Sequence, residues 1–194
     1  MSSNHRVTVI LGSNIDREHN LPAAVRLLGE AANVIGVSSV YETIAAGSHR
    51  QPNYFNAVVL LETRLSPAEL KDGLLTTVEQ ILGRRRTADK FAPRTIDLDI
   101  VLYLGLNNDD IIVDDYIPTD GRLRHLPDPD LLLYAHSAVP MAELFPELIH
   151  PETGESLRSI AARLLAKASA KGEEPMRLRP DIDLQWVLDQ ASGR

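Results

Sequence analysis

The most informative absence is cysteine, of which the 194-residue sequence has none. Without thiols neither a disulfide framework nor a thiolate metal site can form, and the chain is compatible with a reducing compartment. Long apolar runs are also missing, since no window approaches the roughly 20 apolar residues that a membrane-spanning helix requires. The segment Met1 to Asn14 lacks the apolar core of a signal peptide. We therefore expect a soluble, cytoplasmic protein without a membrane partner.

Positive charge is in short supply, because 20 lysine and arginine residues are set against 27 aspartate and glutamate residues, for a formal net charge of −7. Such a chain repels a phosphate backbone at long range. Aromatic residues make up only 5% of the sequence, whereas RNA-binding sheets present aromatic side chains within a basic face. We expect no nucleic-acid partner, and an anionic ligand requires a local basic cluster.

What is present is an ordinary globular composition, with 44% hydrophobic and 24% charged residues. A chain of this length fits one domain with a single core and a single site. We expect one domain over residues 1–194, with its core at about 7–170 and a C-terminal extension at 173–194. We expect this domain to be a monomer or a weak homodimer.

Capping signals and β-rich runs predict two helices and four strands in the first half of the chain. Asn20, followed by Pro22, is expected to cap one helix, and Ser66-Pro67-Ala68-Glu69 is a capping box for a second helix that Gly83 ends. The expected strands are Val7–Leu11, Val34–Tyr41, Tyr54–Thr63 and Thr95–Leu104. This order is the split βαβ arrangement. We expect an α+β fold with a ferredoxin-like βαββαβ core, an antiparallel sheet with helices on one face, and a C-terminal helical elaboration.

Periodicity predicts further features of the second helix and of the C-terminal part. The buried stripe of the second helix is expected at Leu70, Leu74, Val78 and Ile81. A last amphipathic helix is expected from Leu157 to about Gly172. Between the two lies an irregular, acidic segment with a short strand at Ile111–Val113. The pattern is weak from Glu173 onward, where Trp186 is expected to pack back on the core.

The strand Thr95–Leu104 carries two acids at alternate positions. Its apolar residues, expected on one face, are Ile96, Leu98, Ile100 and Leu102. Asp97 and Asp99 share the other face, roughly 7 Å apart at the strand rise of about 3.3 Å per residue. Two carboxylates with open water positions are typical ligands of Mg²⁺. The alternative is a solvated acidic face, which is the commoner meaning of an isolated Asp-x-Asp.

Basic residues are concentrated just before these acids. They are Arg84, Arg85, Arg86, Lys90 and Arg94. The cluster suits the triphosphate of a nucleotide. Alternatively, cations near a helix C-terminus are favoured by the helix dipole, which is enough to account for the arginine triplet. That alternative does not readily explain Arg94, which Pro93 holds directly before the acidic strand.

The strand Tyr54–Thr63 offers a second set of polar candidates. Tyr54 and Asn56 have the same parity, so one face presents a ring for stacking and an amide that donates and accepts, which suits a flat heterocycle. A cross-strand aromatic beside a polar edge residue is an equally good interpretation of the pair. Glu79 is expected at the surface unless it meets the nucleotide. The histidines lack a metal-ligand spacing, and no phosphate-cradling glycine-rich loop or nucleophile elbow is present.

The run Lys90-Phe91-Ala92-Pro93-Arg94-Thr95-Ile96-Asp97-Leu98-Asp99-Ile100-Val101 closely resembles the signature of the 6-hydroxymethyl-7,8-dihydropterin pyrophosphokinase family. Three further stretches are similar to that family in order and spacing: Gly12-Ser13-Asn14, Tyr41-Glu42-Thr43 and Gln51-Pro52-Asn53-Tyr54-Phe55-Asn56-Ala57. The resemblance covers the chain from about Val7 to Gly154. It implies transfer of pyrophosphate from ATP to the hydroxymethyl group of the pterin, with release of AMP, in folate biosynthesis.

The resemblance also implies roles for individual residues. Two Mg²⁺ ions would bridge the phosphates and the metal ligands Asp97 and Asp99, and the catalytic residues would be Asp97, Asp99, Arg94 and Arg84. The pterin would contact Thr43, Ala46, Gly47, Tyr54, Asn56, Phe91 and His136. The nucleotide would contact Glu79, Arg84, Arg86, Lys90, Arg94, Ile100, Arg124 and His125. Loops at 45–52 and 84–92 occupy the places where the family closes over its substrates.

One region departs from the family pattern. Many members have Pro-His followed by an arginine and a phenylalanine, where this chain has Pro127-Asp128 followed by Tyr134 and His136. Asp128 is expected to repel the nucleotide, and His125 or Arg124 to replace the missing cation. His136 is expected to replace the stacking ring. A pyrophosphokinase for a modified pterin and a catalytically weakened pterin-binding module remain alternatives.

Overall fold

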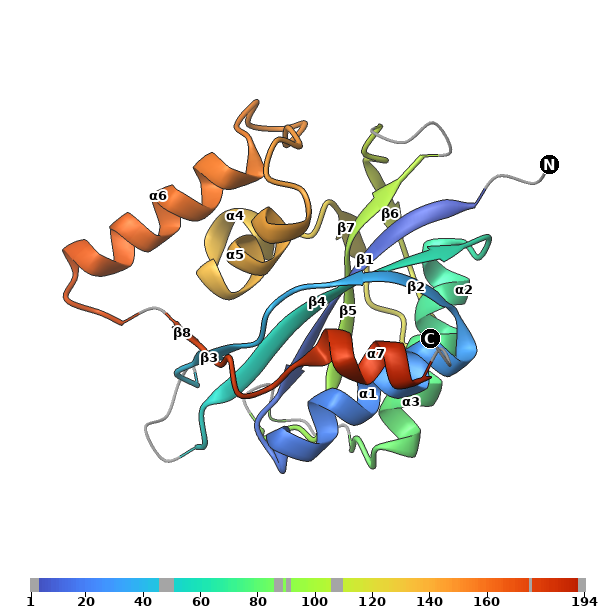
Figure 1. Cartoon of the computed structure of the whole chain (residues 1–194). Helices are drawn as coiled ribbons and strands as arrows, with labels where there is room; N and C mark the ends of the chain where they lie inside the picture. Colours follow the sequence, from blue (N-terminus) through green and yellow to red (C-terminus); the bar gives the residue numbers. More distant parts are fainter. Residues whose placement is uncertain are drawn as a thin grey trace.

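A six-stranded antiparallel sheet runs through the centre of the fold (Figure 1). The computed structural model of the chain describes residues 4–45, 51–85, 89, 92–105, 110–174 and 176–191. The strands of the sheet are β1 (His5–Ser13), β2 (Asn33–Val37), β3 (Tyr41–Thr43), β4 (Tyr54–Thr63), β5 (Asp97–Leu104) and β8 (Arg177–Leu178). Their order is β5-β1-β4-β3-β8, and β2 also pairs with β4. The mixed α and β content and the antiparallel sheet are as expected from the sequence.

Helices lie against both faces of this sheet (Figure 1). They are α1 (Arg17–Ala31), α2 (Pro67–Leu70), the π-helical turn η1 (Lys71–Leu75), α3 (Thr76–Ile81), α4 (Asp130–Leu133), α5 (Ala135–Leu144), α6 (Leu157–Ala170) and α7 (Leu184–Ala191). A separate two-stranded ribbon consists of β6 (Asp114–Tyr116) and β7 (Arg124–Leu126). No helix in the described parts of the chain is long and apolar enough to cross a membrane.

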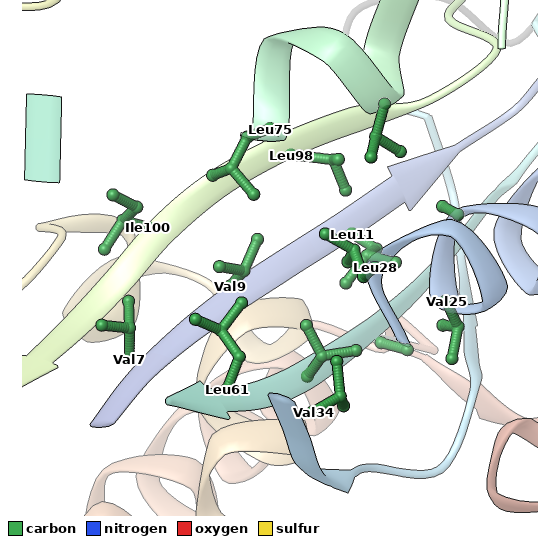
Figure 2. Close-up of a cluster of buried hydrophobic side chains, with 14 of the residues drawn as sticks. Val7, Val9, Leu11, Val25, Leu28, Val34, Leu61, Leu75, Leu98 and Ile100 are labelled. Carbon is green, nitrogen blue, oxygen red and sulfur yellow. The ribbon is translucent and has the colours of Figure 1, made fainter. Parts of the chain in front are cut away.

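The larger core lies between one face of the sheet and the helices α1, η1 and α3. Figure 2 shows Val9 and Leu11 of β1, Leu98 and Ile100 of β5 and Leu28 of α1 within this cluster. All five side chains are at most 1% exposed. Burying one such side chain stabilises the fold by about 1.5–3 kcal/mol. The alternating residues of β1, β4 and β5 on the opposite face are therefore left to build the second core and the pocket.

The first helix begins earlier than expected. It starts at Arg17, and its N-cap is Asp16 in the left-handed region with φ 44°, not Asn20. The Asn20 side chain donates from Nδ2 to the carbonyl of Ile15 at 2.7 Å, so it ties the helix to the preceding loop and does not accept from a helix N–H. Pro22 consequently lies inside the helix.

The strand expected at Val34–Tyr41 is interrupted. Its two parts, β2 and β3, both pair with β4, and the register of β2 shifts between Val34 and Gly36. At the break, Ser38 bonds twice to Val58: the Ser38 N–H donates to the Val58 carbonyl at 2.9 Å and the Ser38 hydroxyl accepts from the Val58 N–H at 2.8 Å. A side chain thus replaces one rung of the ladder.

The second helix changes phase at η1. Its capping box at Ser66 and Glu69 is confirmed, but residues 71–75 form a π-helical turn that inserts extra backbone. At the turn Leu75 is buried in place of Leu74, which is only partly buried, whereas Leu70 and Val78 are buried as expected. Ile81, expected to be buried, is 61% exposed.

The same shift buries two charged residues. Lys71 and Glu79 are each 2% exposed, although Glu79 was expected at the surface. Their side chains form an ion pair with Nζ 3.1 Å from Oε1. The same Oε1 accepts the Leu98 N–H at 2.9 Å, and Nζ also donates to the Leu98 carbonyl. Among the described residues of the main sheet, β5 pairs with β1 alone. The ion pair therefore supplies hydrogen-bond partners to the Leu98 N–H and carbonyl on the other edge of β5.

A bulge reverses the alternation of β5. Val9 of β1 faces Ile100, but the next rung joins Thr8 to Leu102, so Val101 is an extra residue. After a bulge, the side chains that follow exchange faces. Ile96, Leu98 and Ile100 lie in the larger core as expected, whereas Leu102 lies in the second core on the opposite face with α4, α5 and α6.

The chain after β5 differs in detail from expectation. The strand expected at Ile111–Val113 is reduced to one bridge between Ile111 and Leu104, and β6 begins at Asp114. Helix α6 spans Leu157–Ala170, close to the expected range. It packs on α5, and both cover part of the sheet face that carries Val58, Val101 and Leu102.

The weakly patterned C-terminal segment contains the edge strand β8 and the helix α7. Trp186 does not pack on the core, because it is 62% exposed. Leu184 and Leu188 face inward instead, at 2% and 5% exposure. Helix α7 lies along α1, where a Cβ added to Gly29 would come 2.9 Å from Cδ1 of Leu188. The missing side chain at Gly29 therefore lets the two helices approach closely.

The docking of α7 predicts a large loss of stability at one residue of that helix and almost none at another. Leu188→Ala should lower the free energy of unfolding by about 2–4 kcal/mol, because it removes a buried side chain at the α1 contact. Trp186→Ala should change it by less than about 0.5 kcal/mol. Urea denaturation of both variants beside the wild type measures the difference. Equal effects would show that Trp186 shares the contact.

The buried ion pair predicts that the fold is strongly destabilised when Glu79 loses its partner Lys71. Lys71→Met should lower the free energy of unfolding by about 3 kcal/mol, because it leaves the Glu79 carboxylate buried without its counter-charge. The double variant Lys71→Met, Glu79→Leu should be more stable than the single variant. Thermal and denaturant unfolding of the two variants provide the comparison. If Lys71→Met were as stable as the wild type, the fold would not need Lys71 as the counter-charge of Glu79, and the prediction would be wrong.

Candidate active site

A pocket of about 420 Å³ opens on the face of the sheet opposite the larger core. It is lined by Ile10, Gly12, Thr43, Ile44, Tyr54, Asn56, Arg94, Asp97, Asp99, Val101, Asp128, Asp130, Tyr134, His136 and Ser137. Seven of these are candidates from the sequence: Thr43, Tyr54, Asn56, Arg94, Asp97, Asp99 and His136. Five other candidates, Ala46, Gly47, Arg86, Lys90 and Phe91, lie outside the described residues.

The floor of the pocket comes from β3, β1 and β4. Tyr54 and Asn56 point to the same face, and Asn56 Nδ2 donates to Thr43 Oγ1 at 2.8 Å in a buried hydrogen bond. A Cβ on Gly12, between these residues and β5, would lie 3.4 Å from Asn56 Oδ1 and 3.8 Å from the Tyr54 ring. The absence of a side chain at Gly12 therefore leaves a flat floor bordered by a ring and a fixed amide.

Each of the two aspartates meets cations from two other parts of the chain. Asp97 bonds to Arg94 Nη1 and lies 3.6 Å from Arg84 Nη2. Asp99 lies 3.0 Å from Lys71 Nζ and 3.9 Å from Arg124 Nε. The side chains of Asp97 and Asp99 are 21% and 37% exposed, so both carboxylates remain accessible from the pocket.

Lys71 is a charged residue of this site that could not be predicted from the sequence. Burial by itself would lower the pKa of Lys71, but the carboxylates of Asp99 and Glu79 outweigh burial and raise it. The Lys71 ammonium therefore stays charged between the buried carboxylate of Glu79 and the more exposed carboxylate of Asp99. The sequence does not reveal the inward position of Lys71, because the segment has the pattern of a regular helix and nothing in it indicates the π-helical turn that directs Lys71 inward.

Arg94 is fixed by the end of β1. Asn14 Oδ1 accepts the Arg94 N–H at 2.6 Å, and the N–H groups of Asn14 and Ile15 donate to the Arg94 carbonyl at 3.0 Å each. Ser13 Oγ donates to the Thr95 carbonyl at 2.5 Å. These bonds explain why Gly12-Ser13-Asn14 and the acidic strand occur together, since the first segment holds the backbone that presents the arginine.

The wall opposite the floor comes from the segment around α4 and α5. Tyr134 and His136 stack with ring centroids 5.3 Å apart and planes inclined by 26°. Burial lowers the pKa of His136 to about 4, so the ring is neutral near pH 7. Burial raises the pKa of Asp128 to about 6, and its carboxylate accepts the Asp130 N–H at 2.8 Å. An uncharged aromatic pair thus stands beside an acidic group.

The remaining candidates lie at the margin of the pocket or behind it. Arg124 binds Asp120 through two nitrogens, at 2.8 and 3.0 Å, while its Nε faces Asp99. His125 is held between Asp115 at 2.6 Å and Glu152 at 3.1 Å, and it does not line the pocket. Arg124, not His125, is therefore the upstream cation beside the acids.

Two residues expected to contact the nucleotide, Ile100 of β5 and Glu79 of α3, are buried. Ile100 is 1% exposed within the larger core, so its side chain cannot reach a ligand and only its backbone remains for that role. Glu79 is bound to Lys71 and the Leu98 N–H, as described above. Among the described residues, Arg84 Nε is a buried atom without a hydrogen-bond partner, which leaves a donor for an anion at this edge.

Comparison with known proteins agrees with this architecture. Residues 8–146 match the family model for 7,8-dihydro-6-hydroxymethylpterin-pyrophosphokinase (HPPK). The 2-amino-4-hydroxy-6-hydroxymethyldihydropteridine pyrophosphokinase of Synechocystis is 35% identical over 159 residues, covering 79% of this chain and 73% of that protein. The folic acid synthesis protein fol1 of Schizosaccharomyces pombe is 35% identical over 183 residues, covering 93% of this chain.

The longer relatives contain much more than this chain spans. The chain covers 22% of the fol1 protein. A crystal structure of Plasmodium falciparum HPPK-DHPS shares the fold, with a TM-score of 0.71 at 12% identity over 90% of this chain and 49% of that one. Because the family model covers most of the chain and the Synechocystis enzyme is matched over most of its length, the chain belongs to the 7,8-dihydro-6-hydroxymethylpterin-pyrophosphokinase family.

Proposed function

We propose that the chain transfers pyrophosphate from ATP to the hydroxymethyl group of 6-hydroxymethyl-7,8-dihydropterin and releases AMP, as a step in folate biosynthesis. The observation that carries the proposal is the position of Asp97 and Asp99, which share one pocket with a stacking floor and four nearby cations. Membership of the family and the names of its relatives support the same reaction.

The pterin is assigned to the floor beside Tyr54 and Asn56. A pterin ring is flat and has donors and acceptors on its edge, which matches an aromatic side chain next to an amide whose orientation Thr43 fixes. His136 faces the same pocket and is neutral, so it stacks without carrying a charge into the site. Ala46, Gly47 and Phe91 are assigned to this substrate from the family resemblance alone.

The nucleotide is assigned to the side of the pocket bounded by β5. Arg94 and Arg84 converge on Asp97, and Arg84 Nε supplies a donor to an incoming phosphate. Arg124 adds charge near Asp99. Glu79 and the Ile100 backbone lie beside this edge, and Arg86, Lys90 and His125 are assigned to the nucleotide from the resemblance alone. Repulsion between the triphosphate and the acidic chain is thus offset locally.

Asp97 and Asp99 fit a pair of Mg²⁺ ions that arrive with the nucleotide. Among the described residues, no group of three or more histidine and acidic side chains is placed to hold a metal ion. Mg²⁺ usually keeps several waters and binds through one or two carboxylates together with substrate phosphates, so two aspartates are sufficient. When bound, the ions would neutralise charge that develops on the phosphates.

In the reaction, the hydroxymethyl oxygen of the pterin attacks the β-phosphorus of ATP. The bond between that phosphorus and the oxygen shared with the α-phosphate breaks, AMP leaves with this oxygen, and the hydroxyl proton passes to solvent. Such a transfer depends on alignment and on stabilisation of charge more than on covalent catalysis. Arg94 and Arg84 stabilise the charge, and the floor orients the attacking hydroxyl.

The proposal also covers the organisation of the chain. The strand order β5-β1-β4, with β2 and β3 on the far side of β4, supports a ferredoxin-like core formed by the first 104 residues. The helices α6 and α7 and the strand β8 are then C-terminal elaborations of a single domain. The family match ends at residue 146, before these elements begin.

Release of AMP tests the proposed reaction directly. With ATP, Mg²⁺ and 6-hydroxymethyl-7,8-dihydropterin, the wild type should form AMP, and Asp97→Ala should lower kcat by about 10²–10³-fold because it removes a group placed at the transferring phosphates. Chromatography of the nucleotides separates AMP from ADP. Glu30→Ala, on the exposed side of α1, serves as the control and should retain full activity. Formation of ADP, or no turnover by the wild type, would contradict the proposal.

The shifted carboxyl group of Asp128 predicts a pH dependence of stability. Its pKa of about 6 lies above the ordinary value of 3.8 because of burial, so the folded state holds the proton more tightly than the unfolded state. Stability contributed by this group is therefore present at low pH and is lost as pH rises to about 6. Asp128→Asn should raise the free energy of unfolding at pH 7 by about 1–2 kcal/mol and have little effect near pH 4. Urea denaturation at the two pH values measures this, and an equal change at both would contradict it.

A further inference from the structure

The C-terminal extension joins the sheet at the edge of β3, the strand that carries Thr43 of the pocket floor. Strand β8 pairs with β3, with Leu178 opposite Tyr41 and Arg177 opposite Glu42. The next residue, Arg179, donates its N–H to the Val40 carbonyl at 2.9 Å. In Figure 1, the red C-terminal segment passes from β8 beside β3 to α7 along α1. This segment lies outside the family match, which ends at residue 146.

The side chain of Arg179 joins a small, partly buried cluster. Its guanidinium lies 4.4 Å from the centre of the Phe55 ring, and that of Arg17 lies 4.0 Å from the same ring. Both arginines bind Glu42, with Arg17 Nη1 2.9 Å from Oε1 and Arg179 Nη1 3.2 Å from Oε2. Phe55 is 0% exposed. One ring and one carboxylate are therefore held by cations from α1 and from the C-terminal extension.

This cluster lies on the reverse side of the proposed pterin subsite. Glu42 is opposite Phe55 across β3 and β4, and the neighbouring rungs place Thr43 opposite Tyr54 and Tyr41 opposite Asn56. Side chains of successive residues point to opposite faces of a sheet. Phe55 and Glu42 thus point away from the pocket, while Thr43, Tyr54 and Asn56 face it.

The cluster also fixes the residue that precedes the floor. Asn53 Nδ2 donates to Glu42 Oε1 at 3.1 Å, and Arg17 Nη1 donates to the Asn53 carbonyl at 2.6 Å. Asn53 is followed directly by Tyr54. Movement of Glu42 is therefore transmitted to both strands that carry the floor, through the β3 backbone and through Asn53.

We infer that Arg179 is a positioning residue for the pterin, and that the C-terminal extension determines the geometry of the pterin subsite from behind. An ordinary exposed ion pair contributes little, but Arg179 is only 20% exposed, with its charge shared between Glu42 and Asp181 and its plane against an aromatic ring. Both contacts are stronger when partly desolvated. The identity of the ligand rests on the proposed function.

The inference predicts a selective effect on one substrate. In the sheet order, β1 separates β4 from β5, which carries Asp97 and Asp99. Loss of the Arg179 contacts should therefore disturb the pterin floor and leave the nucleotide edge in place. Arg179→Ala should raise the KM and the Kd for the pterin about five- to tenfold, because a cation–π contact and a charge-assisted hydrogen bond are both removed. The KM for ATP should change less than about twofold.

The test compares Arg179→Ala with two matched variants of the full chain. Arg179→Lys, which keeps the charge but not the two-nitrogen geometry, should recover part of the affinity. Arg177→Ala, an exposed arginine on the same strand, should behave as the wild type. Binding of 6-hydroxymethyl-7,8-dihydropterin is measured by calorimetry in the presence of a non-hydrolysable ATP analogue, steady-state AMP release gives both KM values, and thermal unfolding is recorded for each variant.

The outcomes separate the inference from the proposed function. A pterin-selective loss in Arg179→Ala, partly restored in Arg179→Lys, supports the positioning role. If the wild type binds the pterin and Arg179→Ala binds it equally well, or loses pterin and ATP affinity in parallel with its melting temperature, the inference is overturned while the proposed function stands. If the wild type neither binds the pterin nor releases AMP, both are overturned.

Discussion

The site depends on the register of β1, which is hydrogen-bonded along both edges. Gly12 is the partner of Asn56 on β4 and of Asp97 on β5. Neighbouring strands lie about 4.8 Å apart, so this one residue places the amide and the first carboxylate on the same face within about 10 Å of each other. A shift of either pairing by one residue would turn one of the two groups into the larger core. The relative position of these two pocket groups is therefore determined by backbone pairing.

Electrostatic balance is the second requirement of the site. The chain carries a net charge of −7, and two carboxylates on adjacent like-facing positions repel each other. Lys71 and Arg124 are placed at Asp99, and Arg84 and Arg94 at Asp97. These cations come from four separate segments of the chain. These cations therefore offset the repulsion between the two aspartates within the folded chain.

The sequence was a good guide wherever local chemistry decides the structure. The capping box at Ser66, the strand Tyr54–Thr63 and the shared face of Asp97 and Asp99 follow from rules that act over a few residues, and the structure has all three. The basic cluster and the pair of Tyr54 and Asn56 were also identified from the residues alone, and the family resemblance added Thr43 and His136 as candidates. Seven of the fifteen residues that line the pocket could be named in this way.

Errors arose where one extra residue changes a period. The π-helical turn at 71–75 and the bulge at Val101 each displace the pattern by one position, and neither has a composition that distinguishes it from a regular helix or strand. Lys71 was missed and Leu102 was assigned to the wrong face for this reason. The prediction that Trp186 packs on the core was wrong for a different reason. The close approach of α7 to α1 depends on Gly29, which is more than 150 positions away in the chain.

The bulge in β5 has an effect beyond its own strand. At Val101 the carbonyl accepts the N–H of Asp128 at 2.9 Å, and the reversed alternation places Leu102 under the helices α4 to α6. The bulge thus provides two contacts for the wall that carries Tyr134 and His136. The Val101 carbonyl binds the backbone of the wall at Asp128, and Leu102 packs against its helices. Helices α4 to α6 also pack against Val58 of β4, so an exchange of apolar residues in this wall acts on the strand that carries Asn56 as well as on the pocket.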